Sequence, residues 1–351
     1  MKQIKLNYLI PLLLIMVLAS CHKDKIIPVP DKPAATRAGL YILNQGGFGS
    51  NNSTLTYYDY TSKQLTADIF STVNGTKLGD TGNDMEIYGS KMYIAVNNSD
   101  RIDVLDSKTG KLIKQNKLHQ CRSIAFYNGN AFITSYDGNV AVMDTVTLTI
   151  NKLIFVGRNP EQLVVSNNKL YVANSGGLSF GNPDKTVSVI DLTSLSEIKK
   201  ITVTANPVSI TADTYGNVYV LSLGDFAKIL PGMTIINSTT DVVKSQPLVS
   251  LGFNIPIAAQ GDFVYYVTAD NKIAVYNAKT QTPAQANFIT DGTVITAPYD
   301  VAADPLTGEI FVTDAKDYSS NGELFAFDKT GKKEYSIITG INPGKVAFVN
   351  K

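Results

Sequence analysis

A three-residue pattern with an aromatic centre recurs seven times along this chain of 351 residues. Its centres are Tyr41, Tyr93, Phe132, Tyr171, Tyr219, Tyr265 and Phe311, which lie 52, 39, 39, 48, 46 and 46 residues apart. Apolar neighbours on both sides of each centre, as in Leu40-Tyr41-Ile42, indicate a strand that is buried on both faces. A repeat of this length is typical of architectures in which each unit buries its apolar face against the next unit.

Each repeat contains three further predicted strands around this triplet. A tight turn precedes the triplet, as at residues 128–130 (NGN) and 215–217 (YGN), and suits a hairpin that needs positive φ. An alternating strand follows and ends in an acidic or amide residue at Asp59, Asp106, Asp144, Asp191, Asn237, Asn277 and Asp328. A loop with Thr or Gly then leads to another strand, such as residues 148–156 or 195–203. Four strands in about 45 residues are typical of a β-propeller blade.

The two ends of the repeat region indicate how such a ring closes. The first repeat begins at Leu40 without a preceding strand, whereas residues 341–351 supply a strand that belongs to no repeat. Residues 343–348 also resemble residues 207–212, which precede the triplet at Tyr219. The sequence therefore predicts an all-β, seven-bladed β-propeller over residues 39–351, closed by the C-terminal strand as the inner strand of the N-terminal blade.

The first 38 residues indicate export rather than fold. Residues 1–20 have a charged start and an apolar run, residues 9–18, that is too short to span a bilayer, which is typical of a signal peptide. Leu18-Ala19-Ser20-Cys21 looks like a bacterial lipobox, so we expect lipidation of Cys21 and membrane anchoring through several acyl chains. Residues 21–38 carry Pro and Lys without an apolar period and predict a tether. An ordinary secretory peptide with a nearby Cys is the alternative.

The composition excludes several classes of function. Charged residues are 17% of the chain, and the formal net charge is +1, so there is no electrostatic footprint for nucleic acid. Two Cys and two His cannot build a disulfide framework or a Cys/His zinc site. Trp is absent, which counts against quinoprotein propellers with their repeated Trp-docking motif.

Catalytic motifs are missing as well. There is no Gly-x-Ser-x-Gly, and residues 46–49 (GGFG) lack the Lys-Ser/Thr of a phosphate loop. We therefore expect no enzyme and no catalytic cofactor, although a carboxylate-only lyase or glycosidase stays open. His119 and Cys121 form a lone pair, for which we expect a buried structural Cys and a locally bonded His. The acidic loops at residues 80–84 and 314–317 lack EF-hand spacing, so we predict no metal and leave calcium open.

Two sets of segments resemble known propeller families. Residues 170–174 (LYVAN) and 187–191 (VSVID) resemble the YncE-like and surface-layer propeller repeats. Residues 40–60 and 68–106 resemble a Bacteroidetes lipoprotein propeller family, described by a domain of unknown function, that includes surface-exposed vitamin B12-binding proteins. The resemblance implies capture of cobalamin or a related corrinoid, a TonB-dependent outer-membrane transporter as partner, and placement on the cell surface. Asp24 is the only acid close behind Cys21, so the periplasmic face stays open.

The candidate binding residues come from the loops of one face. In a propeller, the loops between the second and third strands and the links between blades gather around the central channel. Here they hold isolated aromatics, Asn and Arg, which suit a large neutral ligand with amide groups, such as a corrinoid or an oligosaccharide. The predicted contacts are Phe48, Asn97, Arg122, Tyr136, Arg158, Asn174, Phe180, Phe226, Tyr299 and Tyr318. The alternative is that the aromatics pack their own loops and the Asn residues serve turn geometry.

The leading hypothesis is thus a non-enzymatic, outer-membrane-anchored lipoprotein that captures cobalamin and passes it to a TonB-dependent transporter. A protein-interaction or adhesion propeller without a small-molecule ligand is one alternative, and a carbohydrate-active propeller is another.

Overall fold

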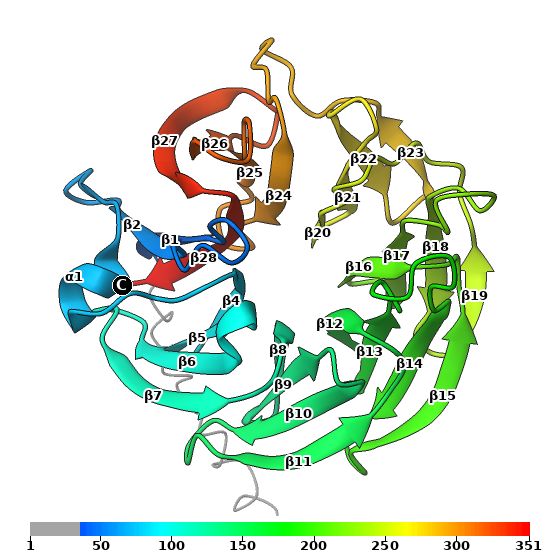
Figure 1. The fold of residues 1–351 in the computed structure, drawn as a ribbon. Helices are drawn as coiled ribbons and strands as arrows, with labels where there is room; N and C mark the ends of the chain where they lie inside the picture. The colour runs from blue at the N-terminus through cyan, green and yellow to red at the C-terminus, as the bar shows by residue number, and fades with distance from the viewer. Residues whose placement is uncertain (1–35) are drawn as a thin grey trace, which may run out of the picture. The chain divides into compact units, whose positions relative to one another are not determined.

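The computed structural model describes residues 36–351, so the predicted signal peptide and Cys21 lie outside the described residues, as does the tether up to residue 35. Within the described residues, seven four-stranded antiparallel sheets are arranged around a central axis (Figure 1). The chain is therefore an all-β, seven-bladed propeller, and the prediction from the repeat is confirmed.

Six blades follow the chain from the inner strand outward. The first three of these are β4 (Gly82–Tyr88), β5 (Lys91–Val96), β6 (Arg101–Asp106) and β7 (Leu112–Lys117); β8 (Cys121–Tyr127), β9 (Asn130–Ser135), β10 (Asn139–Asp144) and β11 (Ile150–Phe155); and β12 (Pro160–Ser166), β13 (Lys169–Asn174), β14 (Thr186–Asp191) and β15 (Ser196–Thr202). The next three are β16 (Pro207–Ala212), β17 (Asn217–Ser222), β18 (Gly232–Asn237) and β19 (Val242–Ser245); β20 (Ile257–Gln260), β21 (Phe263–Val267), β22 (Ile273–Asn277) and β23 (Thr282–Gln285); and β24 (Pro298–Ala303), β25 (Ile310–Asp314), β26 (Asn321–Phe327) and β27 (Lys333–Ile341).

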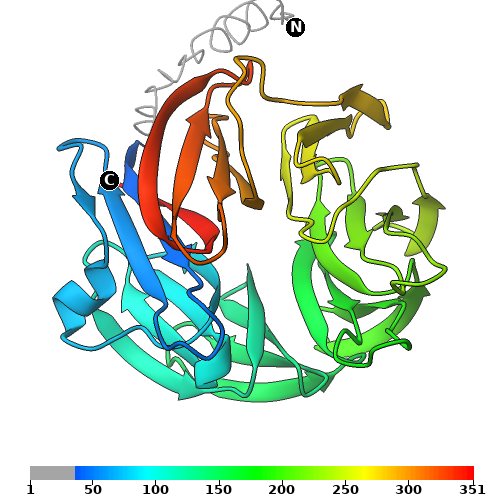
Figure 2. The same ribbon diagram turned by 45° about the horizontal axis from the view of Figure 1, so that its top comes forward.

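The remaining blade combines both ends of the described chain. Its strand order is β28 (Pro343–Asn350), β1 (Arg37–Asn44), β2 (Thr54–Asp59) and β3 (Leu65–Thr66). Figures 1 and 2 show β1 in blue beside β28 in red, and the two pair antiparallel with Leu40 opposite Phe348. The predicted closure by the C-terminal strand is confirmed. Strand β1 begins two residues before the expected boundary at Gly39.

The aromatic repeat forms the contacts between blades. The aromatic centres lie on β1, β5, β9, β13, β17, β21 and β25, and all seven are buried. In the described residues, seven apolar clusters each join one blade to the next. Tyr41 packs with Met85 and Ile94 of the following blade, and Phe311 packs with Leu40 and closes the circle. Burial of one such side chain contributes about 1.5–3 kcal/mol, which explains why the triplet recurs.

The acidic or amide residue that ends each third strand forms a turn. Backbone N–H groups two and three positions later donate to Oδ1 of Asp106, from Lys108 at 3.1 Å and from Thr109 at 2.9 Å. The side chain and backbone of Thr109 lower the pKa of Asp106. The same turn follows Asp59, Asp144, Asp191 and Asn237. These turns all lie on one face of the ring, which we call the turn face.

One short helix was not expected from the sequence. Helix α1 (Ile69–Asn74) lies in the link between β3 and β4, with Asp68 accepting from the backbone N–H of Ser71 and Gly75 in the left-handed conformation at φ 67°. Six residues are too few to show a helical period, so the caps hold it. Among residues 36–351, no helix is long and apolar enough to cross a membrane.

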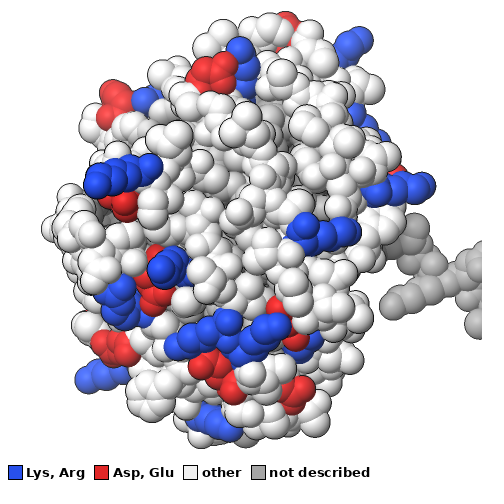
Figure 3. All heavy atoms as spheres, turned by 90° about the vertical axis from the view of Figure 1, so that its right-hand side faces the viewer, with Lys and Arg blue, Asp and Glu red and all other residues white. Residues whose placement is uncertain are grey.

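The outer side of the ring is polar and mixed in charge. Figure 3 shows Lys and Arg side chains next to Asp and Glu side chains on the side that it presents, with many uncharged residues between them. Charges of both signs are therefore interspersed there, as expected for a chain whose basic and acidic residues number 31 and 30.

Candidate functional site

The channel opens on the face opposite the turn face, which we call the loop face. Here a cavity of about 430 Å³ is lined by Gln45, Gly46, Phe48, Thr81, Asn97, Gln120, Arg122, Tyr136, Leu178, Tyr299 and Asn342. We call it the mouth cavity. Five of the ten predicted contact residues line it, namely Phe48, Asn97, Arg122, Tyr136 and Tyr299. Loops and strand ends from five blades therefore converge there, as the loop-face argument predicts.

One wall of the mouth cavity is a half-buried cation clamp. The Nε atom of Arg122 donates to Oε2 of Glu161 at 2.8 Å, and the guanidinium lies 4.9 Å from the ring centre of Tyr136. The Tyr136 hydroxyl donates to the other oxygen of Glu161, and Nη1 of Arg122 donates to Oδ1 of Asn83. Burial, followed by the charge of Glu161, raises the pKa of Tyr136, so its hydroxyl remains a donor. The clamp therefore presents a fixed stack of ring and guanidinium.

The opposite wall is formed by Tyr299. Its hydroxyl donates to Oε1 of Gln45, and its ring meets the ring of Tyr318 edge to face with centroids 6.1 Å apart. Burial raises the pKa of Tyr299 to about 12. Tyr318 is the more exposed of the two, at the tip of the loop between β25 and β26. This pair gives the mouth a second rigid aromatic surface.

Phe48 stands at the rim on a loop that the protein holds in place. The carboxylate of Asp80 accepts from the backbone N–H groups of Gly49 at 3.1 Å and of Asn51 at 3.3 Å. Gly49 has φ +76°, which favours glycine. The Phe48 side chain is 79% exposed. It therefore does not pack its own loop, and its ring faces solvent beside the mouth cavity.

Further exposed aromatics surround this mouth. Phe180, in the loop between β13 and β14, is 90% exposed, and Phe226 and Phe253 lie on neighbouring loops with ring centres 6.1 Å apart. Phe253 and Leu178 were not among the predicted contact residues, although both lie in loops assigned to this face. Glu161 and Gln45 were not predicted either, because each contributes by hydrogen bonding to a residue that is distant in sequence, Arg122 for Glu161 and Tyr299 for Gln45.

One predicted contact residue is wrong, since Asn174 is fully buried at the end of β13. Its amide donates to Thr186 Oγ1 at 3.0 Å and to Ser188 Oγ at 2.9 Å, and its Oδ1 accepts from the backbone N–H of Gly157 at 3.0 Å. Asn44, three residues after its own triplet centre as Asn174 is, bonds in the same manner to Thr54, Thr56 and Gly340. Asn174 thus connects its blade to the preceding link at Gly157, Asn44 connects its blade to the end of β27 at Gly340, and neither exposes surface to a ligand.

Two other predicted residues differ in their setting. Asn97 lines the mouth cavity but is only 6% exposed and donates to the carbonyl of Cys121 at 3.0 Å. Arg158 lies apart in a groove of about 520 Å³ that also borders Tyr136, and it donates to the carbonyl of Asn182 at 3.0 Å. Asn97 therefore positions the wall, whereas Arg158 belongs to a neighbouring groove.

The His119 and Cys121 side chains do not converge. Cys121 is buried, its thiol donates to the carbonyl of Arg101 at 3.2 Å, and burial raises its pKa to about 12. His119 Nδ1 lies 2.8 Å from Oδ1 of Asp137 on the exposed surface. The expectation of a structural Cys and a locally bonded His is confirmed. In residues 36–351, no group of three or more His, Cys, Asp or Glu side chains is placed to hold a metal ion.

Comparison with known proteins places this fold in a family. Residues 38–341 match the model of a family described as a domain of unknown function, DUF5074. The chain belongs to the DUF5074 family. No curated protein matches it in sequence. The expectation of a propeller family described by a domain of unknown function is confirmed, whereas its lipoprotein character and its membership of a YncE-like or cobalamin-binding subgroup stay predictions.

Solved structures share the fold of this DUF5074 propeller at low sequence identity. A quinonprotein alcohol dehydrogenase-like protein from Bacteroides thetaiotaomicron is 17% identical, with a TM-score of 0.66 over 90% of this chain and 79% of that chain. Hydrazine synthase from Kuenenia stuttgartiensis is 15% identical, with a TM-score of 0.60 over 71% of this chain and 76% of that chain. At such identities the likeness concerns the fold alone.

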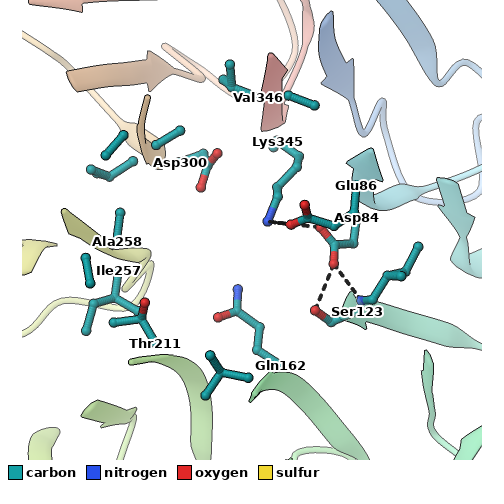
Figure 4. A pocket seen from close by; sticks show the side chains of 18 of the residues that line it. Asp84, Glu86, Ser123, Gln162, Thr211, Ile257, Ala258, Asp300, Lys345 and Val346 are labelled. Carbon is teal, nitrogen blue, oxygen red and sulfur yellow. Dashed lines mark hydrogen bonds and ion pairs between the residues drawn. The ribbon is translucent and has the colours of Figure 1, made fainter. Parts of the chain in front are cut away.

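Below the mouth cavity, the channel of this DUF5074 propeller continues through two more cavities. One of about 370 Å³ shares Gln45, Arg122 and Tyr299 with the mouth and adds Phe253 and Asn254. The next, of about 470 Å³, reaches toward the turn face and is lined by charged and apolar residues of the inner strands (Figure 4). We call it the lower cavity. The channel thus has an aromatic upper end and a charged lower end.

Proposed function

We propose that this protein is a non-enzymatic binding protein whose loop face captures cobalamin or a related corrinoid. The observation that carries the proposal is the mouth cavity, in which the exposed ring of Phe48, the stacked pair Arg122–Tyr136 and the ring of Tyr299 surround one opening. Aromatic faces cover a flat apolar macrocycle, and such contacts contribute beyond the area that they bury.

The polar lining of the mouth cavity suits the periphery of a corrinoid. Four amide residues, Gln45, Asn97, Gln120 and Asn342, line the same opening as the aromatic rings. An amide both donates and accepts, so it matches the amide side chains around a corrin ring without requiring a charge on the ligand. A ligand of this size would extend beyond 430 Å³ and contact the exposed rim at Phe180 and Phe253.

The rigidity of the mouth favours tight binding. The Phe48 loop is held by Asp80, and the Arg122 clamp is held by Glu161 and Asn83. Preformed contacts of this kind lose little conformational entropy when a ligand arrives. We infer that the protein acts by capture and release, without a chemical step.

The proposed site of action rests on the sequence. Lipidation at Cys21 would anchor the propeller at the outer membrane, and the tether would let the loop face work away from the lipid surface. The resemblance to cobalamin-binding lipoproteins supports the cell surface and a TonB-dependent transporter as the recipient of the ligand. Gene neighbourhood tests this part, because a cobalamin-type transporter gene should lie beside the gene for this protein.

The decisive experiment is calorimetric titration of the purified protein with cyanocobalamin, together with co-elution followed at the visible absorbance of the ligand. We expect binding at micromolar concentrations or below. Phe48→Ala should weaken it about tenfold, because one aromatic contact is lost. The matched control is Phe263→Ala, which removes an exposed ring from the turn face and should leave affinity unchanged. Absence of both heat and co-elution would refute the proposal.

One observation favours a protein partner as the second candidate. Leu248 is 99% exposed and Leu230 is 79% exposed, and both lie in loop-face segments away from the lining of the mouth cavity. Exposed apolar residues that gather into one patch are typical of docking surfaces, so these two side chains are the first place to look for a protein partner. If cyanocobalamin does not bind, docking through these loops becomes the leading function.

A further inference from the structure

The lower cavity has a composition unlike that of the mouth. The inner strands follow one another around the axis in the order β28, β4, β8, β12, β16, β20 and β24. Three consecutive strands in this circle supply its charged wall: Lys345 from β28, Asp84 and Glu86 from β4, and Asp300 from β24 (Figure 4). None of the aromatic residues of the mouth cavity lines this lower cavity.

The charges on this wall do not balance. Lys345 Nζ lies 3.2 Å from Oδ1 of Asp84 and 2.9 Å from Oε1 of Glu86. Asp84 is further satisfied, because its Oδ2 accepts from Ser123 Oγ and from the backbone N–H of Ile124, both at 2.8 Å. Asp300 adds a third carboxylate. One ammonium therefore faces three carboxylates.

Asp300 is the carboxylate of this wall that makes no ion pair with Lys345. Its Oδ2 atom is buried and has no hydrogen-bond partner among the described residues, and Figure 4 shows the carboxylate turned into the cavity. A buried charge without a partner is costly, and functional sites are where such costs persist. The wall therefore has an uncompensated negative charge, and it lies at Oδ2 of Asp300.

The facing wall is uncharged and mostly aliphatic. The strands opposite the charges, β12, β16 and β20, line the cavity with Val164, Ile210, Ile257 and Ala258 and bring no ionisable side chain to it. The polar side chains on this side are uncharged, as with Gln162. A ligand that satisfies both walls must carry a positive charge and a hydrocarbon part.

We propose that the lower cavity binds an organic cation, an alkylammonium or alkyldiamine, with its ammonium group at Asp300 and Glu86 and its hydrocarbon chain against Ile210 and Ile257. The volume of about 470 Å³ lies in the range of small-molecule sites. A bare metal ion would leave the apolar wall unused. This site is separate from the mouth cavity and does not depend on corrinoid binding.

The protonation of the wall agrees with this site. Burial, opposed by the charge of Lys345, raises the pKa of Asp300 to about 6, and burial also raises the pKa of Glu86. An incoming ammonium stabilises the ionised carboxylates and releases protons. Binding should therefore weaken about tenfold from pH 7.5 to pH 5, as Asp300 becomes protonated in the free protein. Arg37 also lines this cavity, but its guanidinium is already paired, because its Nε donates to Oδ2 of Asp304 at 2.8 Å.

The test is calorimetric titration of the purified protein with diaminopentane and with pentylamine, using pentanol and calcium chloride as comparison ligands. Both amines should bind, and pentanol, which lacks the charge, should not. Asp300→Asn should weaken amine binding at least tenfold, whereas the exposed control Asp270→Asn should leave it unchanged. A thermal melt of each variant confirms that it is folded.

Three results would overturn the proposal: neither amine binds at millimolar concentration, Asp300→Asn binds amines as the unaltered protein does, or calcium binds and the amines do not. Cyanocobalamin binding is measured on the same Asp300→Asn sample. Because Asp300 lies outside the mouth cavity, that affinity should be unchanged, so failure of the two proposals can be told apart.

Discussion

The two faces of this ring are built from the same repeat but differ in what they expose. On the turn face, each third strand ends in an Asp or Asn whose side chain closes a short turn, as at Asp106 and Asn237. On the loop face, the corresponding segments differ in length from blade to blade and carry exposed rings such as Phe48 and Phe180. The regular face carries the repeated turns of the fold, and the irregular face carries the exposed rings of the proposed cobalamin site.

This difference also runs down the channel. The upper end has aromatic and amide side chains held by the Arg122 clamp, whereas the lower end carries the unbalanced charges around Lys345. A substitution on the turn face should therefore change stability alone, and one at the mouth should change stability and binding together. Substitutions on each face and in the channel test that separation.

The largest effect is expected from removing β28, the strand that closes the ring. Deleting residues 341–351 removes β28, which pairs with β1 and carries Lys345 of the lower cavity. The apolar contacts of Val346 and Ala347 would be lost and β1 would become an open edge. We expect the melting temperature to fall by about 10 °C or more, or the transition to lose cooperativity, by circular dichroism. Deleting Lys351 alone is the control, and an unchanged melt of the longer deletion would contradict ring closure.

The second effect concerns the mouth. Glu161→Ala leaves the Arg122 guanidinium without its carboxylate and removes the acceptor of Tyr136. Breaking one partner of a largely buried pair costs about 2–4 kcal/mol. We expect lower stability in denaturant titration together with weaker cyanocobalamin binding. If stability falls and binding stays intact, the clamp has no role in shaping the mouth.

The repeat made most of the fold predictable. Buried aromatic centres such as Tyr93 and Phe132, and turn residues such as Asp144, carry the blade pattern in the local sequence, and the orphan C-terminal strand carries the closure. Helix α1 was not predictable, because its six residues depend on the caps at Asp68 and Gly75 rather than on a period.

The site was predictable in its location and less so in its members. The rule that loops gather on one face brought Phe48 and Tyr299 to the mouth correctly. Asn174 failed because an amide at a strand end serves a ligand or a neighbouring strand equally well, and its partners Thr186 and Ser188 are defined only by strand pairing. The lower cavity could not be predicted from the sequence, since each inner strand contributes only one or a few residues to its lining.

The third effect is confined to the turn face. Asp106→Ala removes the acceptor of two backbone N–H groups and of the Thr109 hydroxyl. We expect a loss of about 1 kcal/mol in the free energy of unfolding, with cyanocobalamin binding unchanged. Asp106→Asn is the matched control, because Asn237 already fills the same position and accepts from Thr239 and Thr240. A binding defect in Asp106→Ala would show that the two faces are not separable.

The smallest effect is the pH dependence of stability, which has opposite signs for Asp300 in the channel and for Asp106 in a turn. Because the pKa of Asp300 is raised to about 6, the folded protein between pH 4 and pH 6 holds a proton that the unfolded chain has released. Stability therefore falls as pH rises through this window, and ionised Asp300 destabilises the fold above it. Asp106 has a lowered pKa, so its contribution has the opposite sign and is lost as pH falls.

Asp300→Asn should thus raise the melting temperature of amine-free protein by a few degrees at pH 8 and leave it unchanged at pH 4. Melting curves of the dialysed protein at both pH values measure this. A variant that melts lower than the unaltered protein at pH 8 would mean that the carboxylate stabilises the empty channel. In that case the lower cavity would already be balanced in charge, and its need for a cation would disappear.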